Sequence, residues 1–243
     1  MSVEIIPHQA ALITGGAKRI GRAIAFSLAK RGYSIALHYH DSKLEAQETA
    51  EEIERFGGRC RVFQADLADP HAVESLIPEV FTSLPGCSLL IHNASLFERA
   101  TMDQSDVNLF DRLVSVNLRG PFLLSRSFAK FCLRGHVIHL LDAETPNQSK
   151  PYFLYTWTKR SLKLFNDMLA MELAPDIRVN AVSPGLVLPS GRFTENEFER
   201  MSRRIPPSRT GSPEDVVNAV LFLIDNTHIT GECLHVDGGA HLV

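Results

Sequence analysis

The sequence predicts an α/β domain in which one parallel sheet carries helices on both faces. Short apolar runs alternate with longer amphipathic stretches, most of these runs lack polar–apolar alternation, and no linker or internal repeat interrupts them. Strands buried on both faces have continuous apolar sequences, and strand–helix alternation implies right-handed crossovers. We therefore expect one doubly wound domain over residues 1–243 with a seven-stranded parallel sheet.

Each expected element has its own signal in the sequence. Seven short segments rich in Ile, Val and Leu are the expected strands: 10–14, 35–39, 61–64, 89–92, 137–141, 178–182 and 233–236. Six amphipathic stretches are the expected helices: 21–31, 43–56, 70–84, 105–133, 152–173 and 213–225. Asp69 before Pro70 and Ser212 before Pro213 predict helix starts, because a capping side chain followed by proline suits a first helical turn.

One long segment, 188–210, has no clear helical or strand pattern. It contains several prolines and charged residues and follows the expected strand 178–182. Ligands of open α/β sheets bind beyond the carboxyl ends of the strands. We therefore expect 188–210 to be an irregular lid over the substrate.

The composition is that of an ordinary globular domain, with 44% apolar residues, 22% charged residues and a formal net charge of −3. This charge gives no broad basic surface, so nucleic acid is not an expected partner. No apolar run reaches the about 20 residues of a membrane helix, and no signal peptide is recognisable. The four cysteines lack metal-binding spacing, and no metal site is expected. We expect a cytoplasmic protein without a membrane partner.

The first expected strand leads into a glycine-containing turn, Thr14-Gly-Gly-Ala-Lys-Arg-Ile-Gly21, which a helix follows. Glycines let the backbone approach a pyrophosphate, and the helix N-terminus supplies free N–H donors. After the first strand of a βαβ unit, such a turn predicts dinucleotide binding.

This turn resembles the TGxxxGxG motif of the short-chain dehydrogenase/reductase family, with Arg19 in place of the middle glycine. Arginine at this place is characteristic of the pteridine reductase or dihydromonapterin reductase branch. The resemblance implies a Rossmann domain in which Arg19 faces phosphate or substrate. Around the cofactor it places Gly15, Lys18, Arg19, Ile20 and Gly21.

The end of the second expected strand, Leu37-His-Tyr-His-Asp-Ser42, has no acid inside the strand to bind the ribose hydroxyls of NAD. This favours the 2′-phosphate of NADPH, although Asp41 would have to turn outward and either histidine could be a strand residue without a ligand. The His-Tyr-His run again resembles pteridine reductases. The side chains expected at this end are Lys18, Arg19, His38, Tyr39, His40 and Ser42.

Further along the chain, the same resemblance implies three more groups of cofactor contacts. These are Asp66 and Leu67 at the adenine, Asn93, Ala94 and Ser95 after the fourth strand, and Pro184, Gly185 and Leu186 at the nicotinamide. Ser95 and Phe97 are also expected at the substrate, where Phe97 could stack on a flat ring. An aromatic residue here could equally be part of the core.

Tyr155 and Lys159 form a Tyr-x-x-x-Lys pair, whose spacing puts both side chains on one helix face. An ammonium near a phenol lowers the phenol's pKa, so Tyr155 is the expected proton donor. The family resemblance implies that both residues also bind the cofactor. It further implies that Asn117, on the preceding long helix, holds a relay water with the lysine.

Asp142 stands where ketone-reducing relatives have a serine, 13 positions before Tyr155. An anionic carboxylate would repel a developing alkoxide, but a protonated one can donate to a ring nitrogen while hydride reaches the adjacent carbon. Pteridine reductases have this exchange. The catalytic residues we predict are Asn117, Asp142, Tyr155 and Lys159, and the substrate contacts are Arg19, Ser95, Phe97, Asp142 and Tyr155. A strand-end cap is the other interpretation of Asp142.

The sequence thus favours an NADPH-dependent reductase of a pterin or folate: dihydrobiopterin, dihydromonapterin or dihydrofolate to the tetrahydro form. A ketone or 3-oxoacyl-thioester reductase is the alternative, and the missing serine argues against it. A non-catalytic NADP(H)-sensing protein is a second alternative, which the complete set of Asn117, Tyr155 and Lys159 disfavours. By resemblance, the chain is expected to form a homotetramer.

Overall fold

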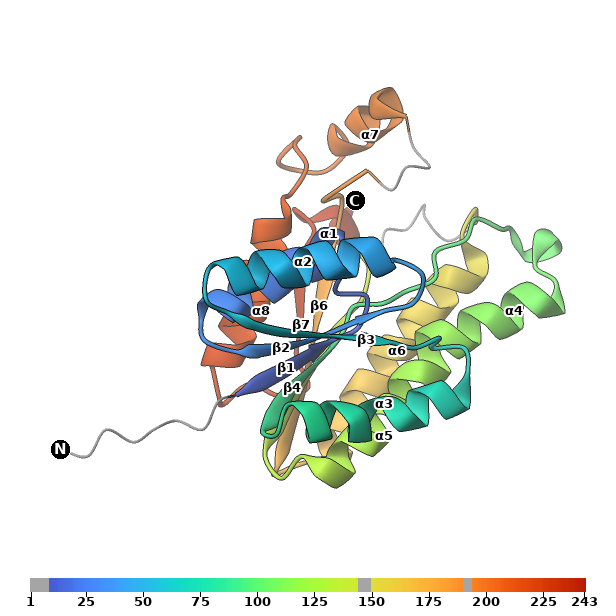
Figure 1. Ribbon diagram of the computed structural model, residues 1–243. Helices are drawn as coiled ribbons and strands as arrows, with labels where there is room; N and C mark the ends of the chain where they lie inside the picture. Colours follow the sequence, from blue (N-terminus) through green and yellow to red (C-terminus); the bar gives the residue numbers. More distant parts are fainter. Residues whose placement is uncertain (1–8, 144–149, 190–193) are drawn as a thin grey trace.

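The structure is a computed structural model that describes residues 9–143, 150–189 and 194–243. In this part of the chain, a seven-stranded sheet has the order β3-β2-β1-β4-β5-β6-β7, and all pairs are parallel (Figure 1). The strands are β1 Ala10–Ile13, β2 Ser34–Tyr39, β3 Arg59–Gln64, β4 Cys87–His92, β5 Gly135–Leu140, β6 Ile177–Pro184 and β7 Cys233–Val236. The predicted single doubly wound domain with a seven-stranded parallel sheet is confirmed.

Helices cover both faces of this sheet (Figure 1). The α-helices are α1 Arg19–Lys30, α2 Lys43–Arg55, α3 Pro70–Ser83, α4 Val107–Val114, α5 Gly120–Phe131, α6 Phe153–Glu172, α7 Glu195–Ser202 and α8 Pro213–Asp225. One core cluster joins α1, α2 and α8 to the sheet, and a second joins α3, α5 and α6 to its other face. The strands between them are therefore buried on both faces, as their apolar sequences indicate.

The helix starts follow the predicted capping residues. Asp69 Oδ1 accepts a hydrogen bond from His71 N at 2.9 Å, and Ser212 forms a reciprocal capping box with Asp215. Both helices have proline in the first turn, where a backbone N–H would have no helical partner, so the missing N–H costs no hydrogen bond.

The expected helix 105–133 is present as one uninterrupted helical stretch that contains a π-helical turn. The structure has α4, then a π-helical turn over Ser115–Arg119, then α5. Pro121 explains the π-helical turn, because its nitrogen cannot donate to the carbonyl of Asn117 four residues earlier. The wider turn buries Asn117, which brings this residue into the site described below.

The expectation that 188–210 lacks regular structure is wrong, because α7 lies inside it. Thr194 and Glu197 form a capping box at the start of α7, with Glu197 Oε2 accepting from Thr194 N at 2.9 Å. The Thr-x-x-Glu spacing was the signal for this helix. Figure 1 shows α7 apart from the helices that cover the sheet.

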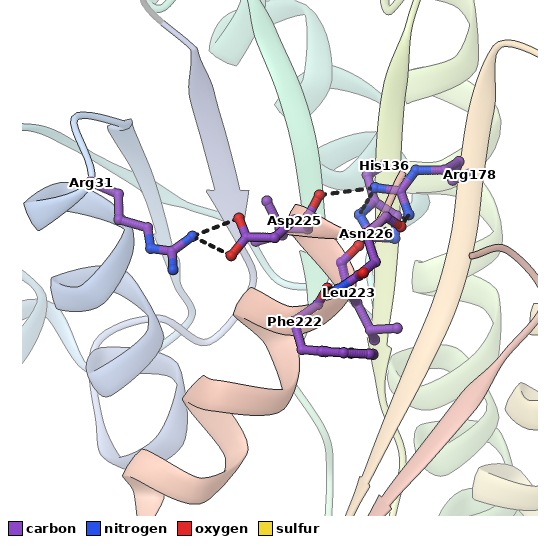
Figure 2. A network of polar contacts seen from close by, with 8 residues as sticks. Arg31, His136, Arg178, Phe222, Leu223, Asp225 and Asn226 are labelled. Atoms are coloured by element: carbon purple, nitrogen blue, oxygen red, sulfur yellow. Dashed lines mark hydrogen bonds and ion pairs between the residues drawn. The ribbon is translucent and has the colours of Figure 1, made fainter. Parts of the chain in front are cut away.

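The opposite end of the sheet is held by a partly buried polar network around Arg178 of β6 (Figure 2). Its Nη1 donates to the carbonyl oxygens of Leu223, Asn226 and Ile229 at 3.0, 3.2 and 2.8 Å. These carbonyls lie at and just beyond the C-terminus of α8, where helical partners run out and the helix dipole attracts a cation. The exposed Arg31–Asp225 ion pair, at 2.7 Å, adds a link from the end of α1.

We predict that Arg178→Gln lowers the free energy of unfolding by about 2 kcal/mol, because it leaves carbonyls of a partly buried helix end without donors. Urea denaturation measures this change. The matched control is Arg31→Gln, since an exposed ion pair contributes under about 1 kcal/mol. Equal effects of the two substitutions would contradict the role given to Arg178.

Candidate active site

Two adjoining cavities lie beyond the carboxyl ends of the strands, with volumes of about 420 and 430 Å³. Both are lined by Arg19, Ile20, Asn93 and Ser95. The first also reaches Lys18, Tyr39, His40 and Ser42, and the second reaches Asp142, Tyr155, Lys159 and the Pro184–Leu186 segment. The predicted dinucleotide and substrate residues therefore meet along one elongated groove.

The glycine turn has the shape that a pyrophosphate site requires. Gly15 has a φ of 61°, and a Cβ on Gly21 would lie 2.4 Å from the carbonyl oxygen of Gly15. The Asn93 amide donates to the carbonyls of Thr14 and Gly15 at 3.0 and 2.9 Å. Asn93 therefore ties the end of β4 to the turn, and the absence of side chains leaves the backbone close to any bound phosphate.

His38 does not lie where the sequence analysis expected it. Its Nδ1 accepts a hydrogen bond from Gly15 N at 3.1 Å, its Nε2 lies 3.0 Å from the Ala65 carbonyl oxygen, and the side chain is buried. Burial lowers its pKa to about 4, so the imidazole stays neutral. The expectation of His38 as a phosphate ligand is wrong: it supports the turn from behind.

The remaining residues at the adenosine end are divided between groove and core. Lys18 pairs with Glu45 at the surface, and His40 Nδ1 lies 3.2 Å from the exposed carboxylate of Asp41, which also lines the first cavity. Asp66 caps its own loop, accepting from Ala68 N at 2.8 Å. Leu67 is buried in the core and lies outside the lining of both cavities, so it supports the site indirectly.

Arg19 connects the groove to the segment before α7. Its guanidinium donates to the carbonyl oxygens of Leu188 and Pro189 at 3.1 and 2.8 Å. Its backbone has a φ of 55°, a left-handed conformation that is unusual outside glycine. Arg19 therefore lies beside both cavities, as expected, and its side chain also holds the residues that follow β6 at Leu188 and Pro189.

Tyr155 and Lys159 lie on one face of α6 at the end of the groove. The Tyr155 hydroxyl donates to Asp142 Oδ2 at 2.8 Å, and Lys159 Nζ donates to the Leu140 carbonyl at 2.8 Å. Burial and the Asp142 carboxylate raise the pKa of Tyr155 well above 10. These two effects act against the lowering that the Tyr155–Lys159 spacing predicts.

Asp142 lies two residues beyond the end of β5, and its Oδ1 accepts from Ala143 N at 2.9 Å. Burial raises its pKa, while the Tyr155 hydroxyl and the Lys159 ammonium oppose the change. Burial also lowers the pKa of Lys159 to about 8. Asp142 and Tyr155 thus form a hydrogen-bonded pair of acids, and Lys159 lies on the same helix face as Tyr155.

Asn117 uses its side-chain amide on neighbouring protein groups. Its Oδ1 accepts from Leu96 N at 2.8 Å, and its Nδ2 donates to the Leu96 carbonyl and to Thr158 Oγ1 at 3.0 and 3.1 Å. These contacts anchor the loop after β4, which carries Ser95 and Phe97. The relay water with Lys159 stays a prediction, and the positioning of this loop is a role that the sequence did not indicate.

Aromatic side chains form one wall of the second cavity. Phe97 stacks on Tyr152 with ring centroids 4.6 Å apart and meets Tyr155 edge-on at 4.6 Å. Phe198 of α7 also lines this cavity. The sequence analysis missed Phe198 because it did not predict α7.

The segment after β6 closes the other side of this cavity. Gly185 N donates to the Val236 carbonyl at 3.0 Å, and a Cβ on Gly185 would lie 2.7 Å from Asp237 Cα. Only glycine allows this approach, which keeps Pro184 and Leu186 at the cavity wall.

The fold and the groove define a Rossmann-type oxidoreductase with a tyrosine–lysine pair at the substrate end. A family model described as Enoyl-(Acyl carrier protein) reductase matches residues 15–241. The chain belongs to the short-chain dehydrogenase/reductase family, whose enzymes use NAD(P)H.

Three relatives illustrate this membership. FolM alternative dihydrofolate reductase 1 of Brucella canis, solved with NADP, is 34% identical with a TM-score of 0.93, covering 98% of this chain and 96% of that chain. A dehydrogenase/reductase of Sinorhizobium meliloti is 32% identical with a TM-score of 0.90, covering 97% and 96%. The 3-oxoacyl-[acyl-carrier-protein] reductase FabG of Staphylococcus aureus is 31% identical over 242 residues, covering 96% and 98%.

Among the described residues, none of the helices has the length and apolarity needed to cross a bilayer.

We predict that Gly21→Ala weakens nicotinamide-dinucleotide binding by at least about 10-fold, because the new methyl group displaces the Gly15 carbonyl from a site that depends on close backbone approach. Titration of the cofactor's fluorescence measures the affinity. Gly211→Ala is the control, since its Cβ would have no neighbour closer than 3.6 Å. Unchanged affinity in Gly21→Ala would show that the turn does not hold the cofactor.

Proposed function

We propose that this protein is an NADPH-dependent reductase of a pterin, converting dihydrobiopterin, dihydromonapterin or dihydrofolate to the tetrahydro form. The observation that carries the proposal is the 2.8 Å hydrogen bond between Tyr155 and Asp142 at the wall of the aromatic-lined cavity. The NADP-containing FolM structure, described as an alternative dihydrofolate reductase, supports it.

The residues that would hold NADPH fit such a ligand. The turn from Gly15 to Gly21 offers backbone donors and room for the pyrophosphate. Lys18, Arg19, His40 and Ser42 would receive the adenosine 2′-phosphate, because they line the first cavity and no strand carboxylate competes for the ribose. Bound NADPH supplies a hydride to the substrate carbon.

The protein's own contribution is a proton for the substrate nitrogen. A C=N bond that accepts hydride at carbon must accept a proton at nitrogen, and the Asp142–Tyr155 pair holds that proton at the cavity wall. Burial raises the pKa of Asp142, which favours the protonated carboxyl that can donate. Lys159 balances the charge that remains on the pair after transfer.

Phe97 would orient the substrate. It lies beside Tyr155, so a flat ring placed against it would face the donor pair. Arg19 and Ser95 also line this cavity and would contact polar groups of the ring. A cavity lined by Phe97, Tyr155 and Phe198 offers aromatic surfaces on which a pterin ring can stack.

A 3-oxoacyl-thioester reductase is the second candidate, because the FabG relative is 31% identical over nearly the whole chain. Asp142 disfavours this reaction, since a carboxylate repels the alkoxide that develops from a ketone. A non-catalytic NADP(H)-sensing protein is the third candidate. The close Tyr155–Asp142 contact disfavours it, because cofactor binding alone does not require this donor pair.

The expectations of a cytoplasmic location and a homotetramer belong to this proposal. Several apolar side chains on the outer faces of α5 and α6 are exposed, among them Phe122, Leu164, Met168 and Met171. Contact with further copies of the chain would cover such surfaces.

The test of the proposal is NADPH oxidation with dihydrobiopterin, dihydromonapterin, dihydrofolate and a 3-oxoacyl thioester. We expect turnover of at least one pterin or folate and little with the thioester. Tyr155→Phe should lower kcat by at least about 100-fold, because it removes the hydroxyl of the donor pair. Tyr33→Phe, at the far end of the sheet, is the control. Preferred turnover of the thioester would select the FabG-like function, and binding without any turnover would select the sensor.

Pterin reduction should also depend on pH in a defined direction. The pair donates a proton only while protonated, so kcat/KM falls as the pH rises through its raised pKa. Asp142→Ser should remove this decline together with most of the activity, and a pH profile of both proteins measures it. An Asp142→Ser variant that reduces pterins faster than the parent would contradict the role of the carboxylate.

A further inference from the structure

The C-terminal turn gathers three potential metal ligands that the sequence analysis did not connect. His235 belongs to β7, Asp237 follows it, and His241 lies in the 3₁₀ turn Ala240–Leu242. One ligand atom of each residue lies within 4.8 Å of the other two. This is the one such group of three found among the described residues.

The turn is built around the carboxylate of Asp237, whose side chain is almost fully buried. Its Oδ1 accepts from Gly239 N at 2.9 Å, and its Oδ2 accepts from His241 N and Nδ1 at 2.9 and 2.7 Å. Gly238 and Gly239 have φ values of 63° and 79°, which reverse the chain and bring His241 back to β7. The site is therefore preorganised by its backbone.

The two imidazoles lie against each other at the wall of a cavity of about 340 Å³. The rings of His235 and His241 are stacked with centroids 4.2 Å apart. The cavity is also lined by Ile205, Pro207 and Arg209 from the segment that follows α7. Asp215 lines it too, so its carboxylate offsets the charge of Arg209. An ion held by the histidines would thus have an open side toward the cavity.

We propose that His235, Asp237 and His241 bind a divalent transition-metal ion of the zinc type. Two imidazole nitrogens and one carboxylate oxygen suit Zn²⁺, Co²⁺ or Ni²⁺, whereas Mg²⁺ and Ca²⁺ prefer oxygen ligands. Tetrahedral bonds of about 2.1 Å place ligands about 3.4 Å apart. The three ligand atoms lie within 4.8 Å of one another, and the exposed His235 can turn to bring its nitrogen closer to the other two. The 2.7 Å contact between His241 Nδ1 and Asp237 Oδ2 lengthens when the metal replaces the imidazole proton.

Such an ion would stiffen the support of two parts of the reductase groove. Asp237 packs against Gly185, which belongs to the wall of the substrate cavity. Pro207 lies 3.2 Å from the position of a Cβ on Gly238 and belongs to the segment returning from the lid. Ion binding would therefore link β7, the C-terminal turn and the base of the lid, independently of which substrate the enzyme reduces.

The test uses the full chain without a histidine tag. Zn²⁺ should bind with one ion per chain in calorimetry and raise the Tm by a few degrees, because it binds only the folded state. A chelator should reverse the shift, and Mg²⁺ at the same concentration should cause none. Co²⁺ should give the visible absorption of a four-coordinate site. Failure to bind Zn²⁺ or Co²⁺ would overturn the proposal.

Substitution of the ligands locates the site. His235→Gln and His241→Gln should each weaken Zn²⁺ binding by at least about 10-fold, since even outer-shell partners of a metal contribute that much. His228→Gln, at an exposed histidine before β7, is the control and should leave binding unchanged. Asp237 also holds the turn together, so the Tm of Asp237→Asn without metal is compared with that of the parent before Zn²⁺ binding is measured. Equal binding by the His235/His241 double variant, or equal loss in His228→Gln, would show an adventitious ion only.

Discussion

The arrangement of this protein depends on one constraint: every strand of its sheet is parallel, and the strand order reverses between β1 and β4. All carboxyl ends therefore lie at one edge, and the loops after β1 and β4 part there to leave a crevice. Asn93 fixes the geometry of this crevice by donating to the carbonyls of Thr14 and Gly15. The glycine turn, the donor pair after β5 and the segment after β6 are all positioned by this edge.

Burial sets the chemistry at the far end of the crevice. It raises the pKa values of Asp142 and Tyr155 and lowers that of Lys159, so each group is moved toward its neutral form. The two acids then share a proton through a 2.8 Å hydrogen bond. A serine in place of Asp142 would leave a neutral donor suited to a ketone. In the function we propose, the carboxyl of Asp142 instead protonates a ring nitrogen.

Most of the fold could be predicted from the sequence because parallel strands and their helices have local signals. The helix starts at Asp69 and Ser212 are examples, since capping acts within four residues. The π-helical turn before Pro121 also had a local signal, the proline itself, but the apolar periodicity of the stretch outweighed it. The helix after Thr194 had its capping residues as a signal, which the prolines of this segment obscured. The sequence held no local signal that His38 supports the glycine turn, because the burial of a strand side chain depends on what packs against that face of the sheet.

The sequence by itself determined the all-parallel fold, the dinucleotide turn and the identity of the residues that could donate a proton. These features follow from residue type and spacing along the chain. Only the tertiary structure decided that Tyr155 bonds to Asp142, that His38 supports the turn and that His235 and His241 meet around Asp237. Such contacts join residues from separate elements or across a chain reversal. The pKa shifts of Asp142, Tyr155 and Lys159 follow from the burial that this packing creates.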